Sequence, residues 1–140
     1  MMTKTGIKNI ILLSLLVFLP LFLIGCQKDS INGHLDGRWQ IMEIETDGEV
    51  NEVKDQQLYY NFYMHVCNLS FYGGVFAEAN FILENNIIYL SFPYINTPDR
   101  FESLSNYGIY SNPVEFRVVY LDKKKLIMEN DESIITCRKF

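Results

Sequence analysis

The sequence predicts an all-β domain of seven or eight short antiparallel strands, preceded by a segment that directs export. From Arg38 onward, apolar and polar residues alternate with a period of two, the spacing of a strand with one buried face. The turn-forming pairs Gly73-Gly74 and Asn85-Asn86 interrupt this alternation at hairpin spacing. Short strands joined in this way form a sandwich or an up-and-down barrel.

Residues 1–25 have the form of a secretory signal peptide. Lys4 and Lys8 provide a cationic start without an acid, and an apolar run from Ile10 to Ile24 follows. A retained transmembrane helix is the alternative, but it needs roughly 20 apolar residues. This run is shorter and contains Pro20, so we expect the segment to be removed.

The end of the apolar run, Leu23-Ile24-Gly25-Cys26, resembles a bacterial lipobox. The resemblance implies that diacylglycerol is attached to the Cys26 thiol, that the chain is cut before this residue, and that the new amino terminus is acylated. Two or three acyl chains would anchor the protein permanently, because each buried methylene contributes about 0.8 kcal/mol. A buried or disulfide-bonded Cys26 would instead require the apolar segment to be kept.

Removing the signal peptide leaves a lipidated tether over residues 26–36 and a β domain over residues 37–140. Lys4 and Lys8 are lost with it, so 12 − 2 = 10 basic residues face 17 acidic ones, a formal charge of −7. An acidic chain repels phosphates, so we expect neither nucleic acid nor an anionic membrane surface as a partner.

Gln27-Lys28-Asp29 resembles the start of the signals that send lipoproteins of the Bacteroidetes to the outer face of the outer membrane. Ser30 departs from that pattern, which has more acids after the lysine. The resemblance implies a lipid-anchored protein of the cell envelope at the outer membrane, and it leaves surface exposure open.

The first half of the domain contains two predicted strands. Trp39 to Ile44 forms the first, and Thr46 to Gln57 is a polar connection. Leu58 to Phe71 alternates clearly, but its apolar set changes parity near Val66 and Cys67. A β-bulge or a sharp bend produces such a change, so we predict one of the two there.

A short helix near residues 98–107 interrupts the second half. Thr97 can cap its start, Pro98 suits the first helical position, and Gly108 can end it. Alternation predicts the remaining strands at Val75–Leu83, Ile87–Phe92, Val114–Leu121, Leu126–Glu129 and Ser133–Phe140.

The stretch Leu35 to Ile41 contains Gly37 and Trp39, and it resembles the Gly-x-Trp opening of lipocalins. The final hairpins are similar to those of lipocalin-like lipoproteins of the Bacteroidetes. The chain is shorter than a classical lipocalin, and its helix falls in the middle of the sheet. The resemblance implies a small antiparallel meander barrel, closed or nearly closed, with Trp39 packed across its base.

The aromatic content suggests binding. The chain has ten phenylalanines and nine tyrosines, and tyrosine suits both ligand cavities and interfaces. We expect a small apolar or amphipathic ligand in the barrel, lined by Trp39, Leu58, Tyr60 and Phe62. The alternative is a barrel filled by its own side chains, serving as a protein interaction or inhibitor module at the envelope surface.

Cys67 and Cys137 remain once Cys26 is lipidated. In an oxidising compartment the two could form a disulfide, and two separate buried thiols are the alternative.

The sequence predicts no enzyme, no metal site and no cofactor. His34 and His65 are its only histidines, no serine lies in a nucleophile elbow, and no metal-ligand spacing occurs. Lys123 to Lys125 indicates a solvated turn, or a contact with lipid headgroups beside the anchor.

Overall fold

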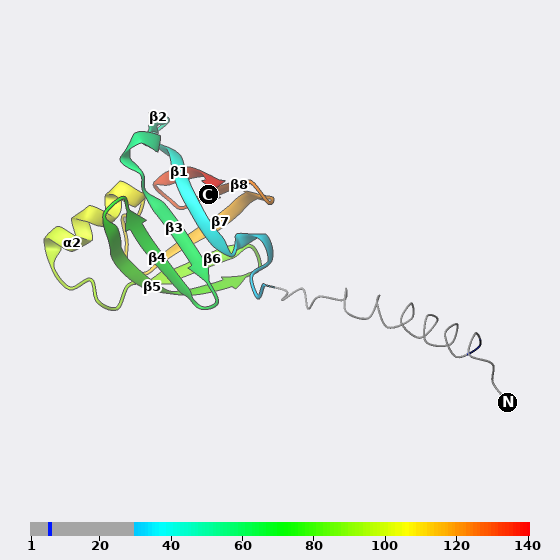
Figure 1. The fold of residues 1–140 in the computed structure, drawn as a ribbon. Coiled ribbons are helices and arrows are strands. Elements are labelled where there is room, and N and C mark those ends of the chain that lie inside the picture. Colours follow the sequence, from blue (N-terminus) through cyan, green and yellow to red (C-terminus); the bar gives the residue numbers. More distant parts are fainter. Residues whose placement is uncertain (1–5, 7–29) are drawn as a thin grey trace.

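Nine antiparallel strands follow one another in the described part of the chain, residue 6 and residues 30–140 of a computed structural model (Figure 1). The strands are β1 (Gly37–Thr46), β2 (Glu49–Glu52), β3 (Tyr59–Tyr63), β4 (Val66–Phe71), β5 (Gly74–Glu84), β6 (Ile87–Ser91), β7 (Val114–Leu121), β8 (Lys125–Glu129) and β9 (Ser133–Lys139). The short helices are η2 (Gly33–Leu35), η3 (Lys54–Gln56), α2 (Pro98–Ser103) and η4 (Leu104–Tyr107).

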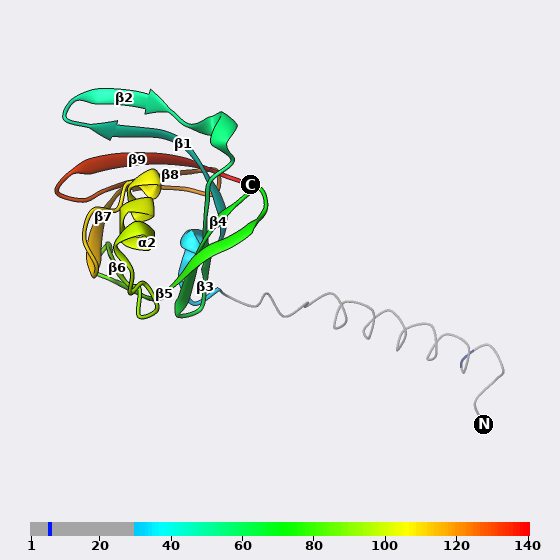
Figure 2. The same cartoon turned by 90° about the vertical axis from the view of Figure 1, so that its left-hand side faces the viewer.

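Pairing between the first and last strands closes the sheet. On one side β1 pairs with β3 through Gly37–Gln40 and with β2 through Glu43–Thr46, and on the other it pairs with β9. Strands β1 and β3 to β9 therefore form a closed barrel of eight strands, and β2 stands outside it as an extra edge strand (Figure 2). The predicted small antiparallel meander barrel is confirmed.

The parity change within residues 58–71 corresponds to the sharp bend, one of the two predicted alternatives, and not to a bulge at Val66 or Cys67. The chain reverses there, because Tyr63 pairs with Val66 and only Met64 and His65 lie between them. Met64 has a left-handed φ of 54°, a conformation that usually falls to glycine or asparagine. The parity change near Val66 therefore marks a hairpin between β3 and β4.

The predicted polar connection at residues 46–57 also contains structure, namely β2 and η3. All four residues of β2 are exposed, so this strand has no buried face that alternation could reveal. The sheet has register shifts between Ile41 and Glu43, between Leu69 and Ser70, and between Val118 and Tyr120.

Aromatic rings fill the barrel interior. The Tyr60 and Phe62 rings stack with centroids 5.9 Å apart, and Phe62 lies 5.1 Å from Phe81. Phe116 meets Tyr60 edge-on at 6.2 Å. Aliphatic side chains complete this core, among them Ile41, Leu69, Ile88, Leu90, Leu126, Met128 and Ile135.

The segment formed by α2 and η4 covers one end of the barrel, which we call the helix end (Figure 2). Leu104, Tyr107 and Ile109 are buried in the core. The Tyr60 hydroxyl donates to the carbonyl of Tyr107 at 2.5 Å, and the Tyr107 hydroxyl donates to the carbonyl of Ser70 at 3.0 Å. Burial raises the pKa of the Tyr107 hydroxyl to about 12, so it stays a donor at neutral pH.

Local signals place this helical segment as predicted. Thr97 precedes α2, Pro98 occupies its first turn, and Gly108 ends η4 with a φ of 74°. A Cβ atom at Gly108 would lie 2.7 Å from the Ile135 side chain, so the position requires glycine for space as well as for conformation.

The opposite end, where residues 30–36 lead into β1, is the tether end (Figure 1). Leu35 in η2 is fully buried, and its carbonyl accepts a 2.8 Å hydrogen bond from Trp39 Nε1. Trp39 therefore packs across the base, as the lipocalin resemblance implies. Residues 33–35 of the predicted tether form η2, and the buried Leu35 packs this segment against the barrel.

Candidate functional site

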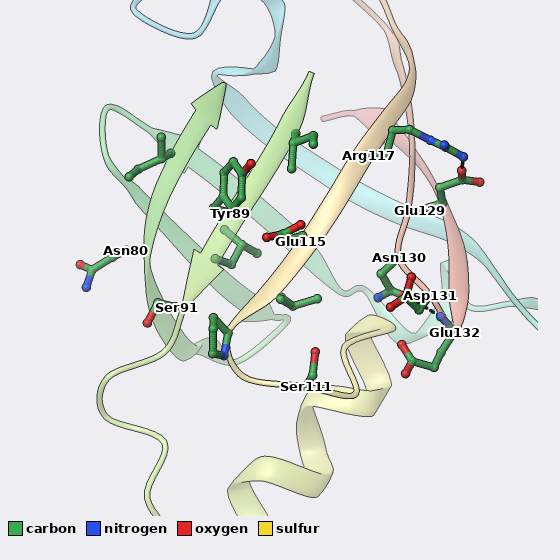
Figure 3. A pocket seen from close by; sticks show the side chains of 15 residues that line it. Asn80, Tyr89, Ser91, Ser111, Glu115, Arg117, Glu129, Asn130, Asp131 and Glu132 are labelled. Atoms are coloured by element: carbon green, nitrogen blue, oxygen red, sulfur yellow. Dashed lines mark hydrogen bonds and ion pairs between the residues drawn. The ribbon is translucent and has the colours of Figure 1, made fainter. Parts of the chain in front are cut away.

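An open groove of about 740 Å³ crosses the outer face of β5 to β8 (Figure 3). It lies outside the barrel, because the side chains at its centre point away from the core. Its lining residues are Asn80, Ile82, Ile87, Tyr89, Leu90, Ser91, Ser111, Pro113, Val114, Glu115, Arg117, Glu129, Asn130, Asp131 and Glu132.

Strand register gathers the floor of the groove. Tyr89 on β6 lies between Ile82 on β5 and Glu115 on β7. The next row places Ile87 beside Arg117. Ile82 is 58% exposed, so a partner can contact apolar surface on the outer face without any rearrangement of the barrel.

Acidic side chains lie within this floor, at Glu115, and around it. Four carboxylates, on Glu115, Glu129, Asp131 and Glu132, face one guanidinium on Arg117, a formal charge of −3. Arg117 and Glu129 form an ion pair across β7 and β8, the only salt bridge among residues 30–140. The other three carboxylates give the groove its acidic character.

A polar turn fixes the rim beside β8. The Asn130 side-chain oxygen accepts from the amides of Glu132 at 2.9 Å and Ser133 at 2.7 Å. Its amide nitrogen donates to the carbonyl of Gly108 at 2.7 Å. The turn is thus tied to the helical segment, which holds the carboxylates of Asp131 and Glu132 near the groove.

A second surface region has the opposite charge. Two hollows of about 550 and 450 Å³ share Arg38 and Tyr72. The Arg38 guanidinium lies 3.9 Å from the centroid of Tyr59 and 5.0 Å from that of Phe140. The two rings already hold this cation, so the region is less free to bind a ligand than the outer groove.

The four residues predicted to line a ligand cavity are all buried in the core. Trp39 and Tyr60 are fully buried, and Phe62 and Leu58 are 1% and 7% exposed. None of the four lines the groove or the two hollows. In this structure they contact other core groups, and their contact with a ligand stays a prediction.

The structure has Cys67 and Cys137 as free, buried thiols, so it contains no disulfide between them. Of the two alternatives, it corresponds to separate thiols. Desolvation in the core raises the pKa of both thiols well above the ordinary value. Such thiols are unreactive, because the thiolate is the nucleophilic form.

Within residues 30–140, no group of three or more His, Cys, Asp or Glu side chains could hold a metal ion. His34 and His65 are both exposed, in η2 and in the β3–β4 turn. No helix of the described residues is long and apolar enough to cross a membrane. The predicted lipidation of Cys26 lies outside the described residues, as does most of the signal segment.

The sequence analysis did not predict the groove, although two apolar residues at outward-facing strand positions could have indicated it. Ile82 and Tyr89 occupy the outward parity of their strands, where polar residues are usual. Their cross-strand pairing depends on the register of β5 with β6, which a single sequence does not specify.

Comparison with known proteins identifies the family. The chain is similar to a lipocalin-like protein from Bacteroides uniformis of known structure, with 23% identity over 77% of this chain and 100% of that one and a TM-score of 0.62. An uncharacterized protein from Bacteroides eggerthii has a similar fold, with 20% identity over 75% of this chain and 98% of the other and a TM-score of 0.59. No curated protein matches the chain. The lipocalin-like domain family matches residues 21–140, and the chain therefore belongs to this family.

Proposed function

We propose that this protein is a lipid-anchored binding protein of the bacterial cell envelope, attached through Cys26 to the outer membrane. The lipobox resemblance of residues 23–26 and the signal-like amino terminus support the anchor. The family match and the structural neighbours from Bacteroides species are consistent with a protein of the Bacteroidetes, the lineage whose lipoprotein signals residues 27–29 resemble.

One observation supports binding at the outer face: the barrel interior is filled by side chains, whereas the groove on the outer face is open. Side chains pack the barrel, and the helical segment covers the helix end. The groove has an apolar floor and a formal charge of −3. An amphipathic, positively charged segment of another envelope protein would match both features, since opposite charges steer partners together.

Photo-crosslinking in intact cells tests this proposal. With p-benzoylphenylalanine in place of Tyr89, we expect a reproducible adduct with one envelope protein. The matched control is the same residue in place of Val119, which is 53% exposed on β7 but does not line the groove. Reversing the rim charges with Asp131→Lys and Glu132→Lys should reduce the Tyr89 adduct about tenfold, which corresponds to about 1.4 kcal/mol. Equal adducts at both positions, or none, would contradict the proposal.

A small apolar or amphipathic ligand inside the barrel is the second candidate. One observation favours it: a single segment, residues 98–107, covers the helix end, so its displacement would open the interior without breaking a strand. Lipocalin-like barrels of this family are suited to such a role.

Trp39, the only tryptophan, reports on this second candidate. Titration with a long-chain fatty acid should change its fluorescence saturably. Tyr60→Phe removes the hydrogen bond to Tyr107 and should tighten binding about fivefold, because opening the segment then costs about 1 kcal/mol less. Tyr110→Phe, at an exposed tyrosine, should leave affinity unchanged. Fluorescence that does not respond to the fatty acid would rule the interior site out.

A further inference from the structure

Three loops gather around the point where the chain enters at the tether end. These are residues 30–36, the β3–β4 turn and the β7–β8 turn (Figure 1). We call their exposed surface the tether face and define it by Ile31, Tyr63, Met64 and Lys123–Lys125. All of these residues are exposed.

Hydrogen bonds hold these loops in fixed positions relative to Ser30. The Asn32 side-chain amide donates to the carbonyl of Met64 at 2.9 Å, and so joins the entering chain to the β3–β4 turn. Lys139 Nζ donates to the carbonyls of His34 and Asp36. The Lys139 amide donates to the carbonyl of Lys124 at 2.8 Å, which connects the β7–β8 turn to the same site.

Gly37 permits this arrangement, because a Cβ atom there would lie 2.7 Å from Lys139 Nζ. Its φ of 129° also lies where side chains are rarely tolerated. The tether face is therefore one surface built by three separate parts of the sequence.

Two acids of this end, Asp122 and Asp36, accept hydrogen bonds from backbone or neighbouring groups. Asp122 accepts from the amides of Lys124 and Lys125 at 2.7 Å each and from the Tyr120 hydroxyl at 2.7 Å. These hydrogen bonds hold the pKa of Asp122 below its ordinary value, and the bond from Tyr120 has the largest effect. Asp36 accepts from the Asn32 side chain at 2.6 Å.

Charge is distributed unequally between the two ends. On the tether face, Lys123, Lys124 and Lys125 lie in or beside one turn with Asp122, and Lys139 bonds to this turn through its amide. At the helix end, α2 contains Asp99, Arg100 and Glu102, and the β8–β9 turn that is bonded to Gly108 contains Asp131 and Glu132. The expectation from net charge, that the chain avoids anionic membranes, therefore does not apply to this face.

Apolar side chains accompany the lysines. Ile31 is 63% exposed, Tyr63 is 68% exposed and Met64 is 46% exposed. Tyrosine at a membrane surface places its ring among the acyl chains and its hydroxyl among the headgroups. Lysines beside such residues are attracted to anionic headgroups.

We propose that the tether face lies against the anionic lipid surface in which the Cys26 acyl chains are inserted. This rests on the proposed anchor, and chain length supports it. Four residues from Cys26 to Ser30 span at most about 14 Å, so the face cannot move far from the bilayer. Contact at this face holds the helix end and the acidic rim of the groove away from the membrane.

Depth-dependent fluorescence quenching in vesicles tests the proposal. The full lipoprotein would carry a single nitrobenzoxadiazole probe on Tyr63→Cys or, as control, on Val50→Cys, an exposed residue of β2. Cys67 and Cys137 are buried and should escape labelling. In vesicles of phosphatidylcholine and phosphatidylglycerol containing nitroxide-labelled lipid, we expect quenching at residue 63 to exceed that at residue 50 by about threefold or more.

A triple variant should reduce quenching at residue 63 about twofold, because it removes the turn charges through Lys123→Gln, Lys124→Gln and Lys125→Gln. The control Lys54→Gln should not change the quenching. Equal quenching at residues 63 and 50, in protein that floats with the vesicles, would overturn the membrane-facing orientation alone. Wild-type protein that does not float with the vesicles would instead overturn the lipid anchor, so the two failures are distinct.

Discussion

Cys26→Ser should abolish lipid attachment and leave the chain uncut. In the proposed attachment the thiol is the nucleophile that accepts diacylglycerol, and a hydroxyl is far less nucleophilic at neutral pH. In cells fed a labelled fatty acid, we expect the wild-type protein to carry the label and to begin at Cys26, with 140 − 25 = 115 residues. The variant should carry no label and should retain residues 1–25 in its intact mass.

Cys67→Ala is the matched control, since it removes a buried thiol and leaves the lipobox intact. It should keep the label and the cut at Cys26. A labelled Cys26→Ser protein, or wild-type protein cut at another position, would refute the anchor.

Trp39→Ala should destabilise the barrel more than most single substitutions, by about 3–5 kcal/mol. The side chain is fully buried, Nε1 donates to the carbonyl of Leu35, and Lys139 Nζ lies 4.5 Å from the ring centroid. Alanine would leave a large cavity at the tether end and an unpaired carbonyl. Urea unfolding followed by circular dichroism measures the loss.

Two further variants complete the test: one separates the contribution of the ring from that of its hydrogen bond, and the other is a surface control. Trp39→Phe keeps an aromatic ring but loses the donor, so it should cost about 1–3 kcal/mol. Val119→Ala, on the exposed face of β7, should change the free energy of unfolding by less than about 0.5 kcal/mol. If Trp39→Ala lowered the free energy of unfolding no more than Val119→Ala, the packing of Trp39 at the base would not stabilise the tether end.

Where elements are defined locally, the sequence predicted them. Alternation located the barrel strands, and Thr97, Pro98 and Gly108 located the helical segment. The sequence predicted a bulge or a sharp bend between β3 and β4 but not a hairpin, because Met64 adopts a left-handed conformation without the usual turn residues. Alternation failed at β2, whose residues have no buried face.

The candidate sites were less predictable, because they depend on which strands become neighbours. The groove needs Ile82, Tyr89 and Glu115 in one row across three strands. The tether face needs Asn32 beside Met64, 32 positions away. Net charge has the same limit, since it does not show that Lys123, Lys124 and Lys125 lie beside Lys139.

Barrel closure by β1 and β9 has a consequence for the order in which the protein is made and folded. Arg138 hydrogen-bonds Gln40, 98 positions earlier in the chain, so the last strand must be present before the seam can form. Pairing over such a separation is slow compared with local hairpins. The barrel can therefore close only after β9 has been synthesised, so a chain that lacks this strand would leave the edge of β1 that faces β9 unpaired.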